Sequence, residues 1–383
     1  AAPEGRFKLE AYPLAGLIGK AELAFTKGSE PLAYRVRAGE GPWVRVFAPN
    51  KLVTDHIEAM TLTPCGWLRV LDAAGAVVED GPIKTEYETV FHEVMAAIAR
   101  HRWPATQPFF PALEISASLP GIEIELAYGD EVLSTSEALH EEFYFSIGEY
   151  LKHRAGLAAG ARTLQPGQII PDIVTADGPA RVVVSVSDRT ERTPLAGPDR
   201  LEDADRPLAP AQIAALTDAL GGEIRDIPSI QGRSVLARVY DGEGPAFLLS
   251  AAQHANETSG IVGALRAAQQ LRAEKQRFAF VPCENPDGYA LHHQLRVRNP
   301  RHMHHAARYS ALGDDVEARE APPLHEKAAR LDLIEAVGAR LHLNLHGYPA
   351  HEWTRPLTGY IPTGFALWTI PKGMFLIFRH LPG

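Results

Sequence analysis

The stretch Ser250-Ala-Ala-Gln-His254-Ala-Asn-Glu257-Thr-Ser-Gly260 decides how the rest of the chain is interpreted. The apolar run at residues 246–249 precedes it, and a helical pattern from residue 261 to about 275 follows it. A His and a carboxylate three residues apart at the end of a buried strand can both face one point, as the ligands of a divalent metal do. Roughly one His-x-x-Glu is expected by chance in an acidic chain with 16 histidines, so the pattern depends on its context.

The composition predicts a soluble globular protein. The chain of 383 residues is 45% hydrophobic and 22% charged, which allows a sizeable core and suggests two domains. A net charge of −9 argues against nucleic acid or an anionic membrane as the main partner, and no apolar run approaches the length of a membrane span. Cys65 and Cys283 are too few for a disulfide framework, and no signal peptide is visible, so a cytoplasmic location is expected. The oligomeric state is left open.

Residues 1–200 are expected to form a strand-rich α+β domain. The half-buried strands expected from alternation lie at residues 6–12, 20–26, 32–37 and 43–47. Further on we expect helices at 86–101 and 136–153, a hairpin of 113–118 with 122–128, and a strand at 180–186. No recognisable catalytic chemistry gathers in this half, so its role is not assigned. A polar, Pro- and acid-rich stretch at 188–210 sets the expected domain boundary near residue 200.

Residues 201–383 alternate between helix and strand. The expected helices are 209–220, 260–275 and 324–339, and the expected strands are 234–240, 246–250, 277–281 and 340–345. Strands separated by helices imply an α/β sheet covered on both faces, with sites beyond the carboxyl ends of the strands. The polar clusters at such ends are His254 with Glu257, Asn285 with Asp287, and His346. The fold class is therefore α/β, with a mixed α/β sheet domain after the strand-rich region.

The segment Leu341-His-Leu-Asn-Leu-His346 is suited to deliver a third imidazole to the site. Catalytic zinc takes three protein ligands and leaves a fourth position for water, and His, Glu, His is an established set. Together with His254 and Glu257, His346 predicts a site for one Zn²⁺. His342 lies about two repeats down the same strand face and is expected to be structural.

With these residues in place, residues 228–348 resemble the zinc metallocarboxypeptidases. Gln231-Gly-Arg233, followed by a strand, a Gly turn, a strand and His254-x-x-Glu257, is similar to that family's opening pattern. Asn285-Pro-Asp-Gly-Tyr289 is similar to the next signature, and Leu343-Asn-Leu-His346-Gly-Tyr348 to the strand of the third ligand. The resemblance implies a zinc carboxypeptidase-type sheet domain, with His254, Glu257 and His346 as ligands and hydrolysis of a peptide bond by metal-activated water.

The resemblance also implies an arginine that polarises the scissile carbonyl. Arg298 is the best match and Arg296 is its competitor. A metal and a fixed guanidinium together hold the negative charge of a tetrahedral intermediate. The family's Asn-Arg pair for the substrate's C-terminal carboxylate has acid in its place, within residues 313–319, and Arg301 or Arg319 is the candidate replacement.

The family's general base, a Glu on a strand well after the third ligand, has no match in this sequence. Glu352 is the only Glu after His346 and lies six residues on, in an expected loop. We therefore expect either a chain truncated at its C-terminus or a metal-binding relative without turnover. Tyr348 is a candidate substrate-binding hydroxyl, and Tyr360 is another. The histidines of His302-Met-His304-His305 are expected to form a polar loop, because no acid or Cys stands at ligand spacing.

Alternative functions remain beside peptide hydrolysis. His254-Ala-Asn-Glu257 is similar to the His-Gly-Asn-Glu of aspartoacylase and succinylglutamate desuccinylase, which would make the chain an amide deacylase of N-acyl amino acids. Against this stand Asn285-Pro-Asp-Gly-Tyr289 and Asn344, where that branch tends to carry Asp. The third alternative is a non-catalytic metal-binding homologue whose strand-rich first half recognises a partner.

Overall fold

The computed structural model divides the chain into two compact units. It describes residues 23–27, 33–47, 49–125, 132–158, 160–188, 195–347, 352–353 and 376–378. The first unit consists of Ala1–Val53, Met60–Ile83 and Ile361–Gly383. The second consists of Thr54–Ala59 and Lys84–Tyr360, and all the candidate functional residues belong to it.

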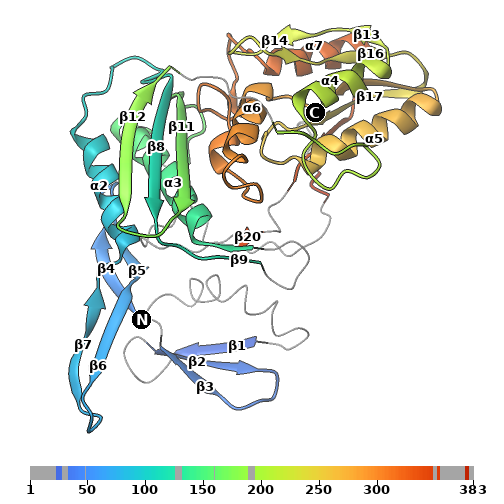
Figure 1. Ribbon diagram of the computed structural model, residues 1–383. Helices are drawn as coiled ribbons and strands as arrows, with labels where there is room; N and C mark the ends of the chain where they lie inside the picture. The colour runs from blue at the N-terminus through green and yellow to red at the C-terminus, as the bar shows by residue number, and fades with distance from the viewer. Residues whose placement is uncertain are drawn as a thin grey trace. The chain divides into compact units, whose positions relative to one another are not determined.

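The described part of the first unit is built of short strands (Figure 1). β1, β2 and β3 form one antiparallel sheet, β4 pairs with β5, and β6 forms an antiparallel pair with β7. Their bounds are β1 (Leu23–Lys27), β2 (Ala33–Ala38), β3 (Val44–Phe47), β4 (Asn50–Thr54), β5 (Met60–Pro64), β6 (Gly66–Leu71) and β7 (Val77–Ile83). The expected strands at 20–26, 32–37 and 43–47 are confirmed, and the one at 6–12 lies outside the described residues.

The second unit begins with a three-stranded sheet centred on β8 (Ala112–Leu119). β8 pairs in parallel with β11 (Gln168–Thr175) and antiparallel with β12 (Arg181–Ser187). The helices α2 (Glu86–Arg100) and α3 (Thr135–Arg154) share a hydrophobic core with this sheet. Both helices and the strand β12 match the sequence-based expectation.

The expected hairpin of residues 113–118 with 122–128 is wrong. β8 covers the first segment, but β9 (Glu123–Glu125) pairs instead with β10 (Val132–Ser134), which also pairs with β20 (Glu352–Trp353). β8 is almost entirely buried, so it needs a neighbour on each side, and it takes both from segments about 50 residues or more further along. Alternation identifies a strand, but it does not choose the partner.

The other main sheet of the second unit has five strands in the order β13-β16-β18-β17-β19. β17 runs parallel to β18 and β19, whereas β16 runs antiparallel to β18 and to β13, so the sheet is mixed and the predicted α/β fold class is confirmed. The bounds are β13 (Glu223–Ile224), β16 (Arg238–Tyr240), β17 (Glu243–Ala251), β18 (Gln276–Val281) and β19 (His342–Leu345), with β14 (Ile227–Pro228) and β15 (Ser234–Val235) forming a separate pair.

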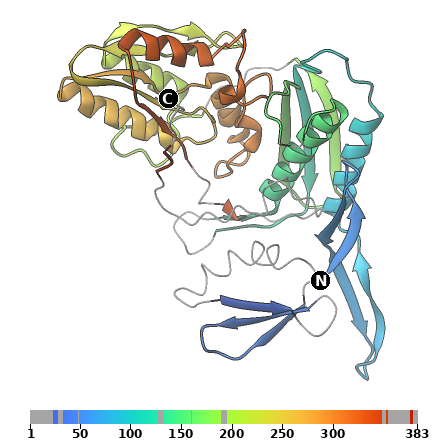
Figure 2. The same ribbon diagram turned by 180° about the vertical axis from the view of Figure 1, so that it is seen from behind.

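Helices cover both faces of this sheet (Figure 1, Figure 2). Their bounds are α4 (Pro210–Ala219), α5 (Ser259–Ala273), α6 (Pro286–Leu295) and α7 (Lys327–Val337), with short 3-10 turns η1 (His305–Ala307) and η2 (Val316–Ala318). Leu249 shares a core with α5, while its neighbour Leu248 shares one with α7. Successive strand residues point to opposite faces, so α5 and α7 lie on opposite sides. Among the described residues, no helix is both long and apolar enough to cross a membrane.

Residue 200, where the sequence suggests a domain boundary, lies inside the second unit. It falls where the chain passes from the core of the β8 sheet to the two cores of the five-stranded sheet. Helix α6 joins these regions, because Leu295 belongs to the first core and Tyr289 to one of the others. The separate roles of residues 1–200 and 201–383 stay predictions.

Helix α5 approaches β19 closely where it begins. A Cβ added to Gly260 would lie 2.8 Å from the carbonyl oxygen of Leu345, the residue before His346. At Gly263, one turn later, the added Cβ would meet only Leu345 Cδ1, at 3.7 Å, which is an ordinary contact. Gly260 therefore lets the helix rest against the backbone that leads to His346.

We expect Gly260→Ala to destabilise the protein by about 1–3 kcal/mol, because the new methyl group overpacks against backbone. The matched change Gly263→Ala should be neutral or stabilise by about 0.5–1 kcal/mol, because Ala favours a helix interior. Urea denaturation of the two variants measures this. Equal stability of the two would contradict the close approach of α5 to β19.

Candidate metal centre

The parallel strands β17 and β19 bring His254, Glu257 and His346 together. Ala251 pairs with Leu345 in the sheet, so the residues after the two strand ends leave at the same edge. Glu257 Oε1 lies 2.8 Å from Nδ1 of His254, and Glu257 Oε2 lies 2.8 Å from Nδ1 of His346. Ligand atoms of all three residues lie within 4.8 Å of one another. The Glu257 carboxylate thus contacts both imidazoles, one with each oxygen.

The loop after β17 is held by the residues that follow β18. The backbone N–H groups of Glu284 and Asn285 donate to the carbonyl oxygens of Ala251 and Ala252. Ala252 has a φ of 51°, a left-handed conformation that costs an L-residue on the order of 1 kcal/mol or more. The hydrogen bonds from Glu284 and Asn285 stabilise this conformation, and the turn places His254 near the end of β19.

The surroundings of Glu257 favour its charged form, and those of His254 favour a positive charge. Burial by itself would raise the pKa of Glu257, but hydrogen bonds from His254 and His346 outweigh burial and lower it to about 2. Burial likewise opposes charge on His254, yet hydrogen bonds to Asp315 and Glu257 raise the pKa of His254 above its ordinary value. A divalent cation held by the three side chains would also satisfy the negative charge of Glu257.

Asp315 supports His254 from its far side. Its Oδ2 lies 3.5 Å from Nε2 of His254, and its Oδ1 accepts a hydrogen bond of 3.1 Å from Gln253. The Asp315 side chain is fully buried, and Arg162 is 3.3 Å from its Oδ2. A carboxylate on the second nitrogen of a metal-binding His fixes its tautomer and ring orientation. The arrangement suits ligation through Nδ1.

Among the described residues, Arg308 is the arginine that contacts Glu257. Its Nη1 lies 3.3 Å from Oε1 of Glu257, and its side chain is 18% exposed. Arg298, which the sequence predicts for this role, instead pairs with Asp172 at 3.0 Å and is 45% exposed. The structure therefore does not place Arg298 with His254 and Glu257, and it offers Arg308 as the guanidinium of the site.

The other basic candidates also have different partners. The buried Arg296 donates from Nε to the carbonyl oxygen of Pro300, and Arg301 pairs with Glu125 at 2.7 Å. Tyr348 and Tyr360 lie outside the described residues.

Residues of the acidic stretch 313–319 contact His254 and the side chains next to it. Asp315 contacts His254, and Glu317 forms an ion pair with Arg330, which also bonds Glu284 and the side-chain oxygen of Gln253. Arg319, expected as a carboxylate clamp, is itself buried among Asp314, Glu326 and Ser310. These charges hold the loop rather than standing open to a substrate carboxylate.

Three further sequence candidates have structural contacts. Asn285 caps α6, since its side chain accepts from the N–H of Gly288, and the buried Asp287 accepts from Ser229 Oγ at 2.7 Å. His342 Nε2 lies 2.7 Å from Ser250 Oγ, a tie between β17 and β19 that agrees with the structural role expected for it.

The sequence did not single out Arg308 or Asp315. Five arginines stand between residues 296 and 319, and nothing in one sequence ranks them, because loop length decides which one returns to the strand ends. Asp315 lies in the acidic stretch that departs from the family's pattern. An acidic residue that follows a basic loop does not by itself identify Asp315 as a contact of His254.

No protein-family model and no curated protein matches this sequence. Similar solved structures include a metallocarboxypeptidase from Pseudomonas aeruginosa in complex with (2-guanidinoethylmercapto)succinic acid, at 19% identity over 37% of this chain and 40% of that chain, with a TM-score of 0.27. A metallocarboxypeptidase from Burkholderia cenocepacia is similar at 19% identity over 37% of this chain and 42% of that chain, with a TM-score of 0.28. Bovine thrombin-activatable fibrinolysis inhibitor is similar at 13% identity over 36% and 58%, with a TM-score of 0.27. The chain thus spans between 40% and 58% of the length of these proteins.

We expect Asp315→Asn to lower zinc affinity about 10- to 100-fold, because the supporting carboxylate orients His254 and raises its basicity. His254→Ala should abolish binding at this site. Zinc competition against a chelator of known affinity measures both. An Asp315→Asn protein that binds zinc as tightly as the unchanged chain would show that Asp315 has no supporting role.

Proposed function

We propose that this protein is a zinc-dependent hydrolase that cleaves a peptide amide bond with metal-activated water. The observation that carries the proposal is the Glu257 carboxylate, whose two oxygens each meet the Nδ1 of one His. A zinc ion held by His254, Glu257 and His346 would polarise the scissile carbonyl and lower the pKa of a bound water.

The exposure of the cluster supports a catalytic rather than a structural metal. The side chains of His254 and Glu257 are 7% and 5% exposed, whereas that of His346 is 41% exposed. Structural zinc is closed off by four protein ligands, but catalytic zinc keeps one position for water or substrate. A site with two buried ligands and one exposed ligand is accessible to water and substrate, as a catalytic zinc site must be.

Arg308 would stabilise the negative charge that develops on the carbonyl oxygen. Its guanidinium is fixed beside Glu257 and over the ring of Tyr309, 5.8 Å from the ring centroid. A preorganised cation in a partly buried site costs no reorganisation at the moment of reaction. Glu257 and Asp315 are both engaged by His254, so the proton of the attacking water would go to another base.

The roles of Arg308 and Arg298 can be separated directly. Arg308→Ala should slow peptide hydrolysis by the full-length protein about 10²- to 10³-fold and leave its zinc content unchanged. Arg298→Ala should change the rate little, because Arg298 pairs with Asp172. Steady-state rates together with metal analysis give the answer. If Arg298→Ala is the slow variant instead, Arg298 is the catalytic arginine and Arg308 is not.

Substrate class follows from a comparison of two kinds of amide. Peptides with a free C-terminus should be hydrolysed in preference to N-acyl amino acids such as N-acetylaspartate, and both rates should vanish in His346→Ala. A reversed preference would make the protein an amide deacylase. Zinc binding with no turnover of either class would make it a metal-binding homologue without catalysis.

A further inference from the structure

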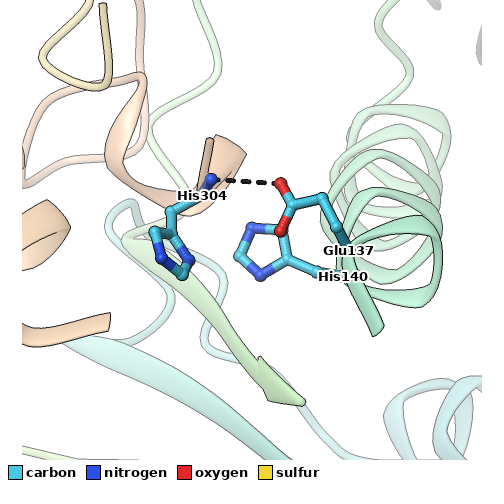
Figure 3. Close-up of side chains that lie close together, drawn as sticks. All are labelled: Glu137, His140 and His304. Carbon is cyan, nitrogen blue, oxygen red and sulfur yellow. Dashed lines mark hydrogen bonds between the residues drawn. The ribbon is translucent and has the colours of Figure 1, made fainter. Parts of the chain in front are cut away.

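A second cluster of histidines and carboxylates lies between helix α3 and the loop after α6 (Figure 3). The sequence suggests a polar loop at His302, His304 and His305, but all three side chains are buried. The acid that the loop lacks comes from α3, where Glu137 stands 167 residues before His304 in the chain. The expectation of a polar loop is wrong, because tertiary packing supplies the carboxylate.

Glu137, His140 and His304 have the donor set of a metal site. One ligand atom from each lies within 4.8 Å of the others. Glu137 Oε1 accepts a hydrogen bond of 3.0 Å from the backbone N–H of His304. Glu137 Oε2 is buried and makes no well-aligned hydrogen bond with the described residues, although Nδ1 of His302 is 3.2 Å away. Burial opposes charge on His302, but hydrogen bonds to Glu123 and Glu137 raise the pKa of His302 to about 9, so His302 is a positive partner of this buried carboxylate.

The two imidazoles are fixed from behind by backbone carbonyls. Nδ1 of His140 lies 2.9 Å from the oxygen of Pro171, and Nε2 of His304 lies 2.8 Å from the oxygen of Asn299. A carbonyl only accepts, so these nitrogens carry the protons and leave lone pairs on His140 Nε2 and His304 Nδ1. Metal-binding histidines are held in this way. Burial also lowers the pKa of His140 to about 4 and that of His304 to about 3, which keeps both neutral.

One existing contact would be exchanged on binding. His140 Nε2 accepts a hydrogen bond of 3.1 Å from the N–H of Ala306, and a coordinate bond would replace it. Tetrahedral zinc ligands at about 2.1 Å from the ion lie roughly 3.4 Å apart, so ligand atoms that now lie within 4.8 Å of one another would move together on binding. Nδ1 of His302 would become a fourth donor only by giving up a proton, because both ring nitrogens face carboxylates: Nε2 lies 3.0 Å from Glu123 and Nδ1 lies 3.2 Å from Glu137.

We propose that Glu137, His140 and His304 form a second, structural site for a divalent transition metal such as zinc. The site is separate from His254, Glu257 and His346, and the proposal does not depend on the proposed function. Its buried ligands join α3 to the loop that runs through η1 to Arg308, which contacts Glu257. A metal there would hold that loop in place.

The first test leaves the new site untouched. The double variant His254→Ala/His346→Ala, loaded with zinc and freed of excess metal, should retain one equivalent by elemental analysis, against two in the unchanged protein. Titration of the same variant with Co²⁺ should give visible bands of four-coordinate cobalt that saturate at one equivalent. No retained metal and no cobalt spectrum in the double variant would overturn the second site.

The second test places the metal. In that background, His304→Asn should lose the remaining equivalent, whereas His293→Asn should keep it. His293 is a matched control, because it is also buried and bonds a backbone carbonyl, that of Leu208, at 3.0 Å. Far-ultraviolet circular dichroism checks the fold of both variants. Metal retained in a folded His304→Asn protein overturns the proposal, while two equivalents that survive in His254→Ala/His346→Ala would count against the proposed function instead.

Discussion

The Glu257 carboxylate is a buried negative charge held between two imidazoles, and the surrounding structure depends on that arrangement. An uncompensated buried charge costs several kcal/mol, and Arg308 beside Glu257 offsets part of this cost, as a bound metal would. The parallel pairing of β17 and β19 supplies both histidines, and the close approach at Gly260 fixes the strand that carries His346. Asp315 then orients His254 from behind. Each of these features positions a histidine beside the Glu257 carboxylate.

The loop from α6 to η2 links this centre to the rest of the unit. It carries Arg308, which contacts Glu257, and Asp315, which contacts His254. Its middle part is held against α3 through His304 and Glu137, far away in sequence. The loop thus joins two histidine and carboxylate clusters, so changes in one are expected to reach the other through the position of Arg308. The loop therefore connects the region of the β8 sheet to the five-stranded sheet within the second unit.

The sequence predicts what is local and misses what depends on long-range packing. His254 and Glu257 are three residues apart at a strand end, and an apolar strand leads to His346, so the sequence alone is enough to pair them. The structure brings the three together, while zinc ligation stays a prediction. The hairpin at β8 failed because alternation does not choose partners. Arg308 could not be ranked among five arginines, and the acid opposite His304 lies 167 residues away.

The most direct measurement is a crystal structure of the zinc-loaded protein, with anomalous data collected on both sides of the zinc absorption edge. We predict a zinc peak bound by Nδ1 of His254, Nδ1 of His346 and the carboxylate of Glu257, with Asp315 on Nε2 of His254. Zinc bound elsewhere, with Glu257 still in direct contact with both imidazoles, would contradict this prediction.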